Sequence, residues 1–102
     1  MTMASPRPLH EIVRERTTLA TEVARLNAAH LRLCQQAGGI EIELLGWRRR
    51  VDAVDASVAD RDALAAAVTR EAAIAAELGR CQAQLDDLGQ RLDELDRELA
   101  QA

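Results

Sequence analysis

The chain has 102 residues, which is enough for one domain or one long helical unit. Apolar residues make up 48% of it, but Trp47 is the only aromatic residue, so a thick globular core is excluded. Residues 1–50 carry 8 Arg and 5 acidic residues, whereas residues 51–102 carry 5 Arg and 12 acidic residues. An acidic second half argues against partners such as nucleic acid or an anionic membrane, and opposite charges suit helices lying side by side.

Composition also gives an expectation about where the protein works. No stretch approaches 18 consecutive apolar residues, so a transmembrane helix is not expected. Residues 1–8 contain no apolar run of the signal-peptide type, which makes the expected location cytoplasmic. All 13 basic residues are Arg and Ala is abundant, which indicates a GC-rich, bacterial genome.

The first two-thirds of the chain has the heptad pattern of a helical hairpin. After a disordered lead-in over residues 1–8, the pattern predicts helices over residues 9–37 and 40–100, joined by a turn at Gly38-Gly39. Apolar residues recur at three- and four-residue steps, and each has a counterpart at the same distance on the other side of the two glycines. The predicted hairpin, residues 9–68, has a seam made of Leu9, Ile12, Leu19, Val23, Leu26, His30, Leu33, Leu44, Trp47, Val51, Val54, Val58 and Val68.

Two local alternatives accompany this prediction. Ile40 to Leu44 alternates apolar and acidic residues, as a strand does, but no second strand is available to pair with it, so helix is preferred. Ser57 and Asp60 have the spacing of a loose capping box, which would favour a helix break near residue 57 and a three-helix chain.

Residues 69–102 form a second, Leu-rich seam whose phase differs by one residue from that of the hairpin. On the predicted hairpin this C-terminal extension has no partner within the chain. A monomer would then expose a continuous apolar row, so we expect it to bind another copy or another helical protein. The predicted partner-binding residues are Leu78, Cys81, Leu85, Leu88, Leu92, Leu95 and Leu99.

Few residues have the spacing of a chemical site. His30 and Cys34 share a helix face, but two ligands do not make a zinc site, and His30 is expected to stack on Trp47. Cys34 and Cys81 are expected to lie roughly 57 Å apart, too far for a disulfide. We therefore expect no metal, no cofactor and no catalytic residue.

Two arginine groups have structural and binding interpretations. Arg16 and Arg61 are expected to share one polar layer, which would fix the register of the hairpin. Arg48, Arg49 and Arg50, next to Trp47, are a possible anion contact at the tip, although three consecutive residues of a helix point in different directions.

Taken together, the sequence predicts an all-α fold: an antiparallel two-helix coiled-coil hairpin with a long C-terminal helix extending beyond it. The predicted function is non-enzymatic, namely an oligomerisation, scaffold or adaptor module that acts through its C-terminal Leu seam. One alternative is a bacterial secretion or assembly accessory or chaperone that binds a client helix. The other is a nucleic-acid-associated regulator that uses the Arg48–Arg50 tip, although a nucleic-acid partner is disfavoured by the charge.

Overall fold

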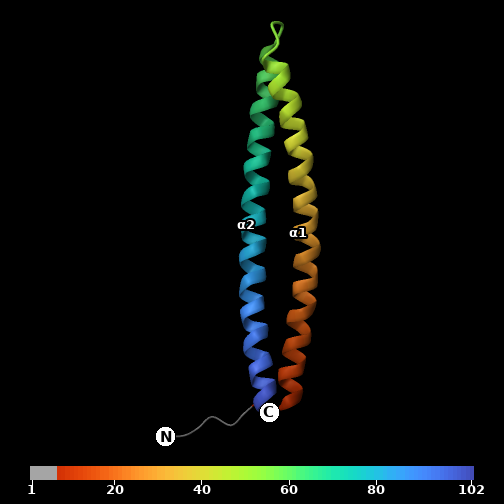
Figure 1. Ribbon diagram of the computed structural model, residues 1–102, viewed down its shortest axis with the longest axis vertical. Helices are drawn as coiled ribbons and strands as arrows, with labels where there is room; N and C mark the ends of the chain where they lie inside the picture. The colour runs from red at the N-terminus through yellow and green to blue at the C-terminus, as the bar shows by residue number, and fades with distance from the viewer. Residues whose placement is uncertain (1–6) are drawn as a thin grey trace, which may run out of the picture.

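The computed structural model describes residues 7–102 as a long helical hairpin. Helix α1 spans Leu9–Val51 and helix α2 spans Val58–Gln101. The two helices run antiparallel and side by side, so that the start of α1 and the end of α2 lie at the same end of the molecule (Figure 1). The principal extents are 77 × 26 × 15 Å, so the protein is a thin rod. The predicted all-α, two-helix hairpin is confirmed.

The predicted position of the turn is wrong. Gly38 and Gly39 lie in the middle of α1, and no glycine in the described part of the chain has a positive φ angle. The apolar series continues through the two glycines by way of Ala37 and Ile40, and Ile40 is buried. A regular heptad repeat is symmetric about many points along its length, so its symmetry about the two glycines did not identify a turn.

The turn lies between α1 and α2, at residues 52–57, where the sequence suggested only an alternative break. The Ser57 hydroxyl accepts a hydrogen bond from the Asp60 backbone N–H at 3.1 Å, and the Asp60 carboxylate accepts one from the Ser57 N–H at 2.9 Å. This reciprocal capping box satisfies two backbone donors that the first turn of a helix leaves unpaired. Arg50 reaches across the turn to Asp55 and Asp60, at 3.1 and 3.2 Å. The break predicted near residue 57 is therefore present, but it separates two helices rather than three.

The moved turn gives α2 a partner along its whole length. The Leu-rich row of residues 78–99 lies against α1, with Cys81 and Leu95 buried, so the premise that it has no partner within the chain is wrong. Its phase is the phase of the entire α2 seam, which begins near Asp60 and includes the buried Ala67 and the partly buried Ile74. The predicted boundary at residue 68 falls inside α2, within a single hairpin.

The predicted hairpin seam is correct for most of α1 and wrong on α2. Ile12, Leu26 and Leu44 are buried, and Leu19, Val23, His30, Leu33, Trp47 and Val51 are partly buried. In contrast Leu9, Val54, Val58 and Val68 are exposed. The error on α2 has one cause, since a turn at the glycines would rotate the seam of α2 by about one residue, or about 100°.

The best-packed part of the rod lies near the turn. Ile40, Leu44 and Ala67 form a buried cluster, and Trp47, Leu64 and Ile74 pack against it. Ile40 and Leu44 are four residues apart and both are buried, which is a helical spacing, and the preference for helix over strand at Ile40–Leu44 is confirmed. The predicted disordered lead-in falls mostly on residues 1–6, outside the described residues.

Candidate functional site

The tip of the hairpin does not assemble the predicted arginine and tryptophan patch. Trp47 packs against the buried cluster, and its Nε1 donates a hydrogen bond to Glu43 Oε1 at 3.3 Å. Arg48, Arg49 and Arg50 are all exposed, and Arg50 forms ion pairs within the turn. An anion at the tip would therefore meet two arginines and no aromatic face. Anion binding at the tip stays a prediction.

The pair of His30 and Cys34 lies together, as the sequence predicts, but away from Trp47. The His30 Nδ1 atom and the Cys34 Sγ atom are 3.6 Å apart. His30 and Trp47 are both on α1 and 17 residues apart, which is roughly 25 Å along the helix, so the predicted stacking is wrong. Among residues 7–102 there is no group of three or more His, Cys, Asp or Glu side chains that could hold a metal ion.

The cysteines are closer along the rod than predicted. The Cys81 Sγ atom lies 3.4 Å from the backbone oxygen of Leu26, which is eight residues, or about 12 Å, from Cys34 along α1. Cys34 is exposed and Cys81 is buried, and both are free thiols. The predicted separation of roughly 57 Å between Cys34 and Cys81 was too large, because it assumed a turn at Gly38-Gly39.

The predicted arginine layer is also absent from the described hairpin. Arg16 lies near the open end of the rod, where its Nε donates a hydrogen bond to Asp96 Oδ1 at 2.7 Å. Arg61 is in the first turn of α2, at the other end of the molecule. The two arginines are therefore at opposite ends, because the true turn pairs each α1 residue with a position far later in α2.

An ion-pair network at the open end ties the two helices together. Arg91 on α2 donates two hydrogen bonds to Glu15 Oε1 on α1, at 2.9 and 2.8 Å. Arg7 lies 2.9 Å from Glu15 Oε2 and donates to Glu98 Oε2 at 2.9 Å, and Arg91 also reaches Glu94. The network fixes the register of the two helices at the end where fraying would begin.

The electrostatics of this network favour the charged forms. Hydrogen bonds from Arg91, and then from Arg7, lower the pKa of the Glu15 carboxyl below its ordinary value. Nearer the turn, the ion pair with Arg70 lowers the pKa of Glu43. Neither pair was predicted from the sequence, because a turn at Gly38-Gly39 places the partners far apart. The available signal in the sequence was acidic residues on one helix and basic residues on the other, at heptad positions next to the seam, where they can pair between helices.

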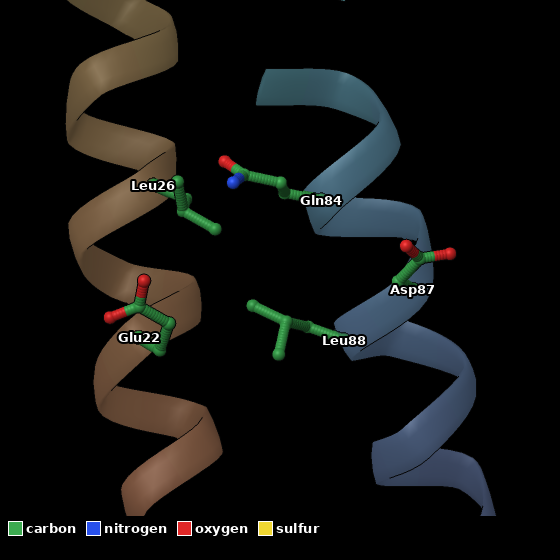
Figure 2. Close-up of a pocket in the computed structure, with 5 residues that line it drawn as sticks. All are labelled: Glu22, Leu26, Gln84, Asp87 and Leu88. Carbon is green, nitrogen blue, oxygen red and sulfur yellow. The ribbon is translucent and has the colours of Figure 1, made fainter. Parts of the chain in front are cut away.

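A shallow groove of about 210 Å³ opens between the helices at mid-height (Figure 2). Leu26 from α1 and Leu88 from α2 project into the space between the helices, and Glu22, Gln84 and Asp87 complete its lining. Glu22 forms an ion pair with Arg25 that lowers the pKa of the Glu22 carboxyl. The groove therefore offers apolar contact between two acidic side chains, and Glu22 is held in its ionised form near neutral pH.

The largest apolar side chains that point away from the partner helix gather on the back of α1. Leu31, Ile42 and Leu45 are exposed by 60%, 73% and 55%. Leu31 and Leu45 lie five residues after Leu26 and Ile40, and Ile42 lies two after Ile40, which turns all three roughly 140–200° away from the seam. We call this surface the outer α1 face. It also contains Gly38, where an added Cβ would meet nothing within 4 Å.

The outer α1 face is an apolar patch made of three large exposed side chains. Single exposed apolar side chains are common on protein surfaces. Three large ones within 15 residues on one side of a helix form an apolar patch of the kind that marks interaction sites. The back of α1 also carries the exposed side chains of Arg14, Arg25 and Arg32. The spacing of Leu31, Ile42 and Leu45 was the available signal.

Comparisons with known proteins do not assign this chain to a family. No protein family, curated protein or solved structure matches this chain. Within residues 7–102, neither helix contains a stretch that is long and apolar enough to cross a lipid bilayer.

Proposed function

We propose that this chain is a non-enzymatic oligomerisation or scaffold module, a rigid helical hairpin that binds a helical partner through the outer α1 face. The observation that supports this proposal most is the exposure of Leu31, Ile42 and Leu45 on a helix whose opposite side is already packed. A rod 77 Å long also separates whatever binds near the turn from whatever is attached at the open end.

The surface differs from the one that the sequence predicted. The Leu-rich row of residues 78–99 faces α1 in this hairpin, and binding a partner there would require the hairpin to open. The outer α1 face needs no such rearrangement. For that reason it is the surface on which the proposal now rests.

The expected association is weak if this surface acts alone. Fully burying one Leu or Ile side chain contributes about 1.5–3 kcal/mol, so three that are already partly covered contribute about 3–6 kcal/mol. Association itself costs at least about 4 kcal/mol. The balance is at best about −2 kcal/mol, which corresponds to a dissociation constant of tens of millimolar, so a measurable complex needs further contacts from the partner surface.

Sedimentation equilibrium on the full chain tests the proposal. Loading concentrations from about 10 µM to 1 mM detect self-association in which the rest of the interface adds at least about 2 kcal/mol to these contacts. An increase in weight-average mass with concentration is the expected result. A mass that stays at that of one chain up to 1 mM would show that the protein does not self-associate, and the proposal of an oligomerisation module would be abandoned.

A further inference from the structure

The two helices carry outer faces that complement each other in size. On the back of α2, small residues recur at three- and four-residue steps and are all exposed, namely Ala65, Thr69, Ala72, Ala76 and Gly79. Most of them lie two or five residues after the seam residues Ala67 and Ile74, which turns them away from α1. We call this row the outer α2 face. It has the narrow profile that accepts large side chains from a neighbouring helix.

The two outer faces lie at the same height on the rod. Contacts between the helices define which residues are level: Leu26 meets Cys81, and Glu43 meets Arg70. Residues of α1 and α2 are therefore level when they are about equally far from the turn. By this rule Leu31 is level with Gly79 to within about one residue, and Leu45 is level with Ala65.

The exposed charges on the two backs follow the same rule. On α1 they are mostly basic, and on α2 they are mostly acidic. Pairing by height joins Glu11 with Arg97, Arg14 with Asp93, Arg25 with Asp86 and Asp87, and Arg49 with Asp62, all of them exposed. Arg80 is an exception, since it is as close in height to Arg32 as Asp87 is to Arg25, and both are basic. Opposite charges that meet along an interface fix register and exclude wrong partners.

From this match we infer that the partner of the outer α1 face is a second copy of this chain, which presents its outer α2 face. Two hairpins placed side by side without an axial shift bring Leu31 and Leu45 of one copy against the small residues of the other. The helices at this new contact run antiparallel, as α1 and α2 do within one chain. This inference rests on the proposed function and specifies its partner and surface.

The contact joins two different surfaces, and this has a consequence for the assembly. A head-to-tail contact leaves one outer α1 face and one outer α2 face unused at the ends, so further copies add, as a ring if the rotation between copies closes and as an open row if it does not. A symmetric contact between two outer α1 faces with the helices parallel would instead bring Arg25, Arg32 and Arg49 of both copies together, where like charges repel.

Paired variants separate these arrangements. Leu31→Gln with Leu45→Gln removes the large apolar side chains from the outer α1 face, and Ala72→Gln with Ala76→Gln fills the outer α2 face. All four positions are exposed, and Gln is a good helix former, so the hairpin is expected to fold normally. Circular dichroism and thermal unfolding check this for each variant. Val13→Gln, at an exposed position outside both outer faces, is the matched control.

Each double variant alone is expected to lose at least tenfold in self-association by sedimentation, whereas Val13→Gln associates as the unchanged chain does. An equimolar mixture of the two double variants retains one intact face of each kind. It should therefore recover the affinity of a single wild-type contact and stop at a dimer.

Other results overturn the inference in distinct ways. Self-association of the Ala72→Gln/Ala76→Gln variant at wild-type strength would show a symmetric contact through α1. Self-association of both double variants at wild-type strength would place the interface elsewhere; an oligomerisation module would remain, but not one that acts through the outer α1 face. A wild-type chain that is monomeric throughout would refute the proposed function together with this inference.

Discussion

Replacing Gly38 and Gly39 together by Ala distinguishes the observed turn from the predicted one by the sign of a stability change. In the middle of α1 both glycines have helical backbone angles, and a new Cβ at either position meets nothing within 4 Å. Replacing glycine by alanine lowers the conformational entropy of the unfolded chain, which favours the helix by about 0.5–1 kcal/mol per site. The double variant should therefore gain about 1–2 kcal/mol of unfolding free energy.

Thermal unfolding followed by circular dichroism at low micromolar concentration measures this gain without interference from association. For a domain of this size, each kcal/mol moves Tm by about 4–8 °C, so an increase of about 4–16 °C is expected. The opposite substitution, Ala66→Gly at an exposed residue inside α2, should lower Tm by a comparable amount per site. A turn at Gly38-Gly39 would need a left-handed backbone, and alanine would then destabilise. A fall in Tm for the double variant is thus the result that refutes the placement of the turn.

Three further measurements test the packing, the turn and the ion pairs. Leu44 is fully buried and its neighbour Leu45 is 55% exposed, so urea unfolding should show a loss of about 2–5 kcal/mol for Leu44→Ala and within about 0.5 kcal/mol for Leu45→Ala. Equal losses would contradict the seam. Ser57→Ala removes the capping box and should cost about 0.5–2 kcal/mol by the same assay, and an unchanged midpoint would deny it that role. Because the folded protein lowers the pKa of Glu15, its stabilising contribution is present above the ordinary value of 4.5 and is lost as pH falls through the folded-state pKa. Tm should therefore fall less steeply below pH 4.5 in Glu15→Gln than in the unchanged chain or in the control Glu41→Gln, and parallel pH profiles would exclude Glu15 as a contributor.

Helix type and seam spacing could be predicted from local information. The steps of three and four residues around Leu26 and Leu44 require one buried stripe per helix, whatever that stripe packs against. Ser57 and Asp60 mark a helix start through a hydrogen-bonding pattern that involves only four residues. The same local spacing identified the Leu-rich seam of residues 78–99 correctly, although it could not name the helix that covers it.

The tertiary structure decided where the chain reverses and therefore which residues meet. A heptad repeat is periodic, so it is compatible with many turn positions, and glycines are tolerated inside a helix at a cost of about 1 kcal/mol each. The cost at Gly38 and Gly39 is small compared with the burial that the turn at residues 52–57 provides, since that turn gives every part of α2 a partner on α1. Contacts such as Glu15 with Arg91 exist only in that arrangement. The sequence by itself thus determined two amphipathic helices and their buried stripes, while the pairing of those stripes, and with it the unpaired outer faces, followed from the global requirement to leave neither stripe in water.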